Sequence, residues 1–113
     1  METIRILLVD DHPVVRKGIR AMLESEEGMQ IIGECADGEQ AVRQYAALRP
    51  DVVLMDLVMP QMDGIEAIRR ILALDKAARI LVLTSFSSDD KVFAALQAGA
   101  AGYLLKDSDP DDL

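Results

Sequence analysis

Short apolar runs alternate with amphipathic segments along almost the whole chain. Four runs are nearly continuous, and a fifth is interrupted by Gly33 and Glu34. Runs of this length, ended by polar or turn-forming residues, are typical of strands buried on both faces of a sheet. The predicted strands are Ile4 to Val9, Met29 to Ala36, Val52 to Asp56, Ile80 to Leu83 and Tyr103 to Leu105.

Between the runs, apolar residues recur at the three- and four-residue spacing of amphipathic helices. Pro13 favours the first turn of the first helix, and Arg49-Pro50 ends the second. The expected apolar faces are Val15, Gly18, Ile19, Met22 and Leu23; Ala41, Val42, Tyr45 and Leu48; Ile65, Ile68, Ile71 and Leu72; and Val92, Ala95 and Leu96. Strict alternation of strand and helix predicts an α/β fold with a doubly wound, five-stranded parallel sheet.

Composition narrows the range of functions. The chain has 113 residues, the size of one domain, and a net charge of −8. This charge argues against binding to nucleic acid or to an anionic membrane by this chain itself. Cys35 is the only cysteine, so no internal disulfide is possible, and no signal peptide is visible. We therefore expect a cytoplasmic domain.

Polar residues gather where the predicted strands end. Asp10 and Asp11 follow the first strand, Asp56 ends the third, Thr84 ends the fourth, and Lys106 follows the fifth. The carboxyl ends of parallel strands meet at one edge of the sheet, where ligands bind. Three carboxylates at close range repel each other and need a neutralising cation. Lys106 and a divalent ion such as Mg²⁺ are the natural candidates.

This set of residues suits phosphoryl transfer. An aspartate can act as a nucleophile toward phosphorus and form an acyl phosphate. The reaction depends mainly on positioning and on neutralisation of charge. Mg²⁺ on Asp11, with Lys106 and Thr84 on phosphoryl oxygens, would supply both requirements at Asp56.

The segments LLVDDHP, MDLVMPQMDG, LTSF and GYLLK match a known family in order and spacing. The chain resembles the receiver domain of bacterial two-component response regulators, and its DDHPVVRKG opening is similar to the NarL/FixJ subfamily. The resemblance spans residues 1–113 and implies a flavodoxin-like strand order of 2-1-3-4-5. It also implies a non-enzymatic switch that assists its own phosphorylation and dephosphorylation.

The resemblance assigns roles to individual residues. Asp56 would be the phosphoacceptor, and Mg²⁺, or alternatively Mn²⁺, would be bound by Asp11, Asp56 and the backbone carbonyl of Val58. Asp10 would act through water. Thr84 and Lys106 would hold the phosphoryl group, and Thr84 and Tyr103 would form the switch. A sensor histidine kinase would be the phosphodonor, and a helix-turn-helix DNA-binding domain outside this chain would regulate transcription.

Two other functions remain open. A Mg²⁺-dependent phosphohydrolase also uses an aspartyl phosphate, but Val58 stands where such an enzyme usually has a second acid. A receiver-like module that binds partners without phosphorylation is disfavoured by the intact set of Asp10, Asp11, Asp56 and Lys106. We interpret His12 as an exposed residue entering the first helix rather than as a ligand or phosphodonor.

The end of the sequence resembles the start of a fifth helix. Ser108 or Asp109 can cap it, and Pro110 suits its first turn. Since the chain stops at Leu113, we expect most of this helix to be missing. The first-helix face near Val15, Ile19 and Met22 would then expose apolar surface and favour a dimer.

Overall fold

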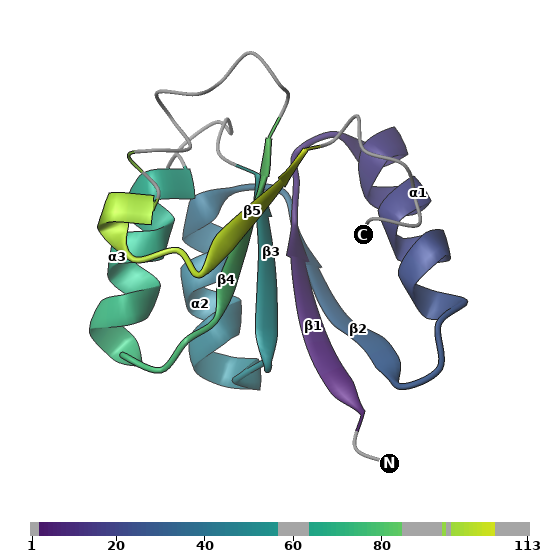
Figure 1. Ribbon diagram of the computed structural model, residues 1–113, viewed down its shortest axis with the longest axis horizontal. Helices are drawn as coiled ribbons and strands as arrows, with labels where there is room; N and C mark the ends of the chain where they lie inside the picture. The colour runs from purple at the N-terminus through teal and green to yellow at the C-terminus, as the bar shows by residue number, and fades with distance from the viewer. Residues whose placement is uncertain (1–2, 57–63, 85–93, 95, 106–113) are drawn as a thin grey trace.

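Figure 1 shows the computed structural model, which describes residues 3–56, 64–84, 94 and 96–105. The side chains of residues 84 and 103–105 are outside this description. Five parallel strands form one sheet in the order β2-β1-β3-β4-β5. The strands are β1 (Ile4–Val9), β2 (Met29–Cys35), β3 (Val52–Asp56), β4 (Ile80–Thr84) and β5 (Gly102–Leu105). The predicted fold class and strand order are confirmed.

In the described part of the chain, three helices connect the first four strands, and their ends follow local rules. They are α1 (Pro13–Glu24), α2 (Gly38–Leu48) and α3 (Gly64–Leu74). Pro13 occupies the first turn of α1, where its missing N–H costs nothing. Asp37 caps α2 by accepting a hydrogen bond from the N–H of Gln40 at 2.8 Å. None of the helices among the described residues is both long and apolar enough to cross a membrane.

The helices divide between the two faces of the sheet, as Figure 1 shows for α1 on one side and α2 with α3 on the other. Ile19 and Leu23 of α1 pack on Ile6, Leu8 and Leu54. On the opposite face, the helix residues and the alternate strand residues form a second core. Its buried members include Leu7, Val9, Ala41, Tyr45, Val53, Met55, Ala67, Ile68, Ile71, Ile80 and Val82. The alternation of strand side chains therefore builds one core on each face.

Some expected boundaries differ or lie outside the described residues. Ala36 lies beyond β2, and its N–H donates to Oε1 of Gln40 in α2 rather than to a neighbouring strand. The fourth predicted helix is represented by residues 94 and 96–98, which are helical. The tail with the expected fifth helix lies outside the described residues.

The expected exposure of the α1 face is wrong for one of its three residues. Ile19 is buried, with 9% of its surface exposed, because it packs on the sheet. Val15 and Met22 are half-buried. The large apolar residue of α1 that faces solvent is instead Val14, which is 83% exposed.

Candidate acidic phosphoacceptor site

The sheet register brings Asp10 and Asp56 to the same edge. Val9 of β1 lies opposite Met55 of β3, so the next residue of each strand is an aspartate. Both residues are buried, with 0% of Asp10 and 3% of Asp56 exposed. Ionised carboxylates are costly to bury without compensating charge or hydrogen bonds. Two such groups on adjacent strands therefore indicate a functional site rather than a solvated surface.

Asp11 and His12 complete a cluster of four side chains. Asp10, Asp11, His12 and Asp56 each offer one possible ligand atom, and these atoms lie within 4.8 Å of one another. The Asp10 carboxylate accepts a hydrogen bond at 2.8 Å from the N–H of His12, the residue that precedes α1. The sequence prediction that the acid pair and Asp56 converge is confirmed.

The His12 ring lies against the acids, a contact that the sequence interpretation of His12 as an exposed residue did not include. Its side chain is 60% exposed, as expected for a residue entering α1. Nevertheless, its Nδ1 lies 3.1 Å from Asp10 Oδ1, 3.0 Å from Asp11 Oδ1 and 3.9 Å from Asp56 Oδ2. Nδ1 can donate to these oxygens when it carries a proton. The position of His12 directly after two acids could have suggested this contact. The direction of the ring, however, is set by the side-chain rotamer, which the sequence does not reveal.

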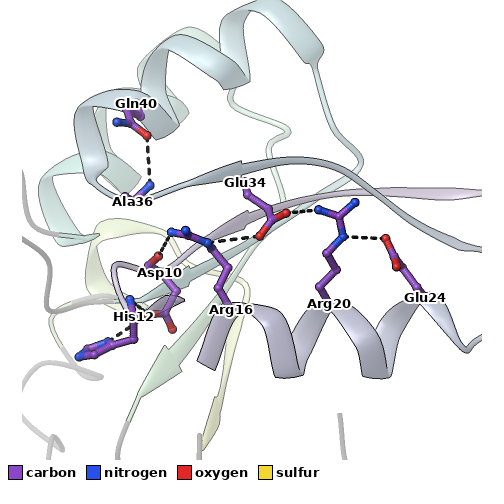
Figure 2. A network of polar contacts seen from close by, with 8 residues as sticks. All are labelled: Asp10, His12, Arg16, Arg20, Glu24, Glu34, Ala36 and Gln40. Carbon is purple, nitrogen blue, oxygen red and sulfur yellow. Dashed lines mark hydrogen bonds and ion pairs between the residues drawn. The ribbon is translucent and has the colours of Figure 1, made fainter. Parts of the chain in front are cut away.

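A second set of polar contacts supports the cluster from the side of β2. Figure 2 shows Arg16 reaching from α1 to the backbone carbonyl oxygen of Asp10, to which its Nη1 donates at 2.7 Å. The N–H of Asp10 donates to the carbonyl oxygen of Cys35 at 3.0 Å. Burial raises the pKa of the Cys35 thiol to about 12, so this neighbour stays a neutral thiol. Cys35 therefore acts as packing rather than as a nucleophile.

The other predicted site residues are only partly described. Thr84 ends β4 and lies opposite Leu105 of β5, so the backbone of Thr84 reaches the same edge as Asp56. The side chains of Thr84 and Tyr103 lie outside the described residues, as do Val58 and Lys106 entirely. Their predicted roles stay predictions.

The described residues fit a hard divalent cation. Asp11 Oδ1 is buried and, apart from the nearby His12 ring, has no hydrogen-bond donor in the described part of the chain. Carboxylate oxygens are the ligands that Mg²⁺ prefers, and the cluster supplies three carboxylates from two neighbouring strand ends. The acidic cluster can therefore hold a metal ion next to a buried aspartate.

The sequence matches the family model described as the response regulator receiver domain over residues 6–113. The chain belongs to this family. Transcriptional regulatory protein LiaR from Bacillus subtilis (strain 168) is 52% identical over 105 residues, covering 93% of this chain and 50% of LiaR. The receiver-domain resemblance predicted from the motifs is confirmed, and the chain spans about half the length of the curated relatives it matches.

Solved receiver structures agree with this assignment. A LuxR-family two-component response regulator from Aurantimonas sp. SI85-9A1 superposes with a TM-score of 0.93 at 46% identity, covering 98% of this chain and 79% of that one. A chain in the CheX-CheY-BeF3-Mg²⁺ complex from Borrelia burgdorferi gives a TM-score of 0.90 at 33% identity. This match covers 98% of the present chain and 84% of the other. This chain is therefore similar to these response regulator structures in both sequence and fold.

Proposed function

We propose that this receiver domain is a phosphorylation-controlled switch that accepts a phosphoryl group on Asp56 from a sensor histidine kinase. The observation that carries the proposal is the convergence of Asp10, Asp11 and Asp56 within one cluster. In the transfer, a carboxylate oxygen of Asp56 forms a bond to phosphorus while the phosphorus–nitrogen bond of the donor phosphohistidine breaks. The product is an acyl phosphate, and the donor imidazole is released.

A bound Mg²⁺ would neutralise the charge that the phosphoryl group brings to an already acidic site. Asp11, Asp56 and the backbone carbonyl of Val58 are the proposed ligands, and Asp10 would contribute through water. The Borrelia burgdorferi complex combines BeF3 and Mg²⁺ with a related chain. That combination supports a magnesium ion and a phosphoryl-like group at one site here.

The switch part of the proposal involves Thr84, Tyr103 and Lys106. Thr84 and Lys106 would each contact a phosphoryl oxygen on Asp56, and movement of Thr84 would open space that Tyr103 fills. The pairing of β4 with β5 supports this idea, because Thr84 lies opposite Leu105, the residue before Lys106. Backbone amide shifts should therefore change most from Thr84 to Tyr103 when a phosphoryl mimic is added.

The partners follow from the same proposal. The domain would regulate transcription through a separate DNA-binding domain, and the similarity to LiaR, which is named a transcriptional regulatory protein, supports the regulatory role. The net charge of −8 supports DNA contact by the separate domain rather than by this chain. Self-association along α1 and a cytoplasmic location are further parts of the proposal. Because Ile19 is buried, the α1 contact would use Val14 with the half-buried Val15 and Met22.

An acyl-phosphate donor tests this function directly. The protein is incubated with acetyl phosphate, with Mg²⁺ or with excess EDTA, and its intact mass is measured. We expect a single phosphoryl group per chain in Mg²⁺ and none in EDTA. A phosphohydrolase would instead release phosphate from p-nitrophenyl phosphate over many turnovers without a stoichiometric adduct. That second result would replace the switch with an enzyme.

A further inference from the structure

Arg16 connects the acidic site to the edge strand β2. Its Nη1 donates to the carbonyl oxygen of Asp10 at 2.7 Å, and its Nε lies 3.2 Å from Oε1 of Glu34. The Arg16 and Glu34 side chains are 23% and 25% exposed, so the ion pair between them is largely shielded from water. Figure 2 shows the guanidinium between the strand end and Glu34. A planar guanidinium held by two acceptors has little freedom to rotate.

We propose that Arg16 is a positioning residue for the metal-binding loop: it fixes the peptide between Asp10 and Asp11, and Glu34 fixes Arg16. This inference rests on the proposed metal site and deepens it. The peptide group is planar, so the Asp10 carbonyl and the Asp11 N–H turn together. An Arg16 side chain that fixes the carbonyl direction therefore fixes the path of the chain into Asp11.

Two other contacts of Asp10 hold groups different from this carbonyl. The Asp10 N–H is held by the carbonyl oxygen of Cys35, and its carboxylate is held by the His12 N–H. The first contact orients the peptide before Asp10, and the second orients its side chain. The Arg16 hydrogen bond holds the carbonyl of the following peptide, which leads to Asp11.

Glu34 holds the Arg16 guanidinium in place, because its own backbone is fixed in the sheet. It lies on β2 opposite Leu8 of β1, two residues before Asp10, so its backbone is part of the sheet. Its carboxylate also pairs with Arg20, which in turn pairs with Glu24 at 2.8 Å. Arg20 is thus one turn further along α1, shares the Glu34 partner, and continues the network away from the acidic site. It offers a matched control for Arg16.

The first test needs no metal. Arg16→Met and Arg20→Met each remove one positive charge from α1 and keep a long apolar stem. The carbonyl carbon shift of Asp10 is recorded by NMR in both metal-free variants. We expect it to move in Arg16→Met, because the hydrogen bond to its oxygen is lost, and to stay near the wild-type value in Arg20→Met. Equal shifts in the two variants would overturn the proposal.

The second test measures Mg²⁺ binding by calorimetry. Loss of an outer-shell partner typically weakens metal binding by 10–100-fold, so we expect the dissociation constant to rise about tenfold in Arg16→Met. Arg20→Met should stay within about twofold of wild type, since it leaves the contact between Arg16 and the Asp10 carbonyl in place and removes a charge further from the acidic site. An Arg16→Met protein that binds as tightly as wild type, or an Arg20→Met protein that is weakened equally, would contradict the positioning role.

A third pair of variants covers the case in which Arg16→Met does not fold. Glu34→Gln loosens the support of Arg16 while leaving the Asp10 contact possible, and Glu24→Gln changes a carboxylate that pairs with Arg20. Mg²⁺ binding should weaken more in Glu34→Gln than in Glu24→Gln, and the reverse order would refute the proposal. Failure of the wild-type protein to bind Mg²⁺ would instead refute the metal site. The carbonyl carbon shift of Asp10 in the metal-free proteins would still test the role of Arg16.

Discussion

At the scale of single residues, Tyr45 forms a polar contact away from the acidic site. Its ring is buried, with 2% of its surface exposed, and its hydroxyl donates to Oδ2 of Asp75 at 2.7 Å. The Arg49 guanidinium carbon lies 5.6 Å from the ring centroid. Burial, followed by the bond to Asp75, raises the pKa of Tyr45 to about 12, and the same bond lowers the pKa of Asp75. This contact joins the ends of α2 and α3.

We expect Tyr45→Phe to lower the free energy of unfolding by about 1 kcal/mol at neutral pH, because it removes one hydrogen bond and preserves the ring. The effect should depend on pH in two windows. The lowered pKa of Asp75 gives stability above its usual pKa of about 4, and this is lost as pH falls below that value. The raised pKa of Tyr45 gives stability below about pH 10, and this is lost as pH rises toward 12.

Urea unfolding of wild type and Tyr45→Phe at pH 3, 7 and 10.5 measures this dependence. The difference between the two proteins should be largest at pH 7 and smaller at both extremes. A difference that is constant across the three pH values would show that packing of the ring, rather than the hydroxyl contact, accounts for the loss.

The sequence predicted that Asp10, Asp11 and Asp56 converge and that His12 is exposed at the start of α1, but it did not predict that the His12 ring approaches the acids. The three acids follow from strand ends, since a parallel sheet brings successive carboxyl ends to one edge. The direction of the His12 ring depends on side-chain rotamers, which apolar patterning does not encode. Arg16 was missed for the same reason: its place on the polar side of α1 gave no sign that it reaches the carbonyl of Asp10.

At the scale of elements, Gly18 and Gly33 have opposite surroundings, and Gly18 is exposed although the sequence placed it on the apolar face of the first helix. Gly18 lies on an exposed part of α1, and a Cβ built on it would meet nothing within 4 Å. Gly33 lies in β2 where α2 packs, and a Cβ there would come within 2.9 Å of Gln44 Oε1 and 3.0 Å of Leu7 and Leu48 side-chain carbons. The strand register also shifts beside it, since Ile6 pairs with Ile31 but Leu7 pairs with Gly33. Gly33 therefore allows close packing, whereas Gly18 does not serve that purpose.

We predict that Gly18→Ala raises the free energy of unfolding by about 0.5–1 kcal/mol, because alanine loses less backbone entropy in a helix. Gly33→Ala should lower it by about 1 kcal/mol, the low end of the overpacking range, because the added methyl group must displace the ends of the Gln44, Leu7 and Leu48 side chains. Thermal and urea unfolding measure both effects. A destabilised Gly18→Ala protein, or a Gly33→Ala protein as stable as wild type, would contradict this account of the two sites.

The sequence predicted all five strands and the three described helices because apolar periodicity determines which segments can be buried. It gave β2 least support, since Gly33 and Glu34 interrupt its apolar run. The structure explains both interruptions: Gly33 makes room for α2, and Glu34 pairs with Arg16 and Arg20. Positions that depart from a simple pattern here carry contacts between elements, which local patterning does not reveal.

At the scale of the whole molecule, the apolar cores and the acidic cluster occupy different parts of the fold. Two apolar cores cover opposite faces of the sheet. The carboxylates of Asp10, Asp11 and Asp56 converge at the carboxyl edge, and the contact between Tyr45 and Asp75 joins helix ends elsewhere. In a chain of the response regulator receiver family, this arrangement gives the expected place for a phosphoryl group. Sequence reasoning predicted this edge because the topology alone determines which strand ends meet there.

The central claim is that Asp56, among the clustered side chains, receives the phosphoryl group. The most direct measurement is to phosphorylate the protein with acetyl phosphate and Mg²⁺, reduce the acyl phosphate with borohydride, and locate the resulting homoserine by peptide mass spectrometry. Asp56→Asn, which preserves the shape of the side chain, serves as the control. We predict a single modified residue at position 56 in wild type and no adduct in Asp56→Asn. Modification at Asp10 or Asp11, or equal labelling of Asp56→Asn, would contradict the account.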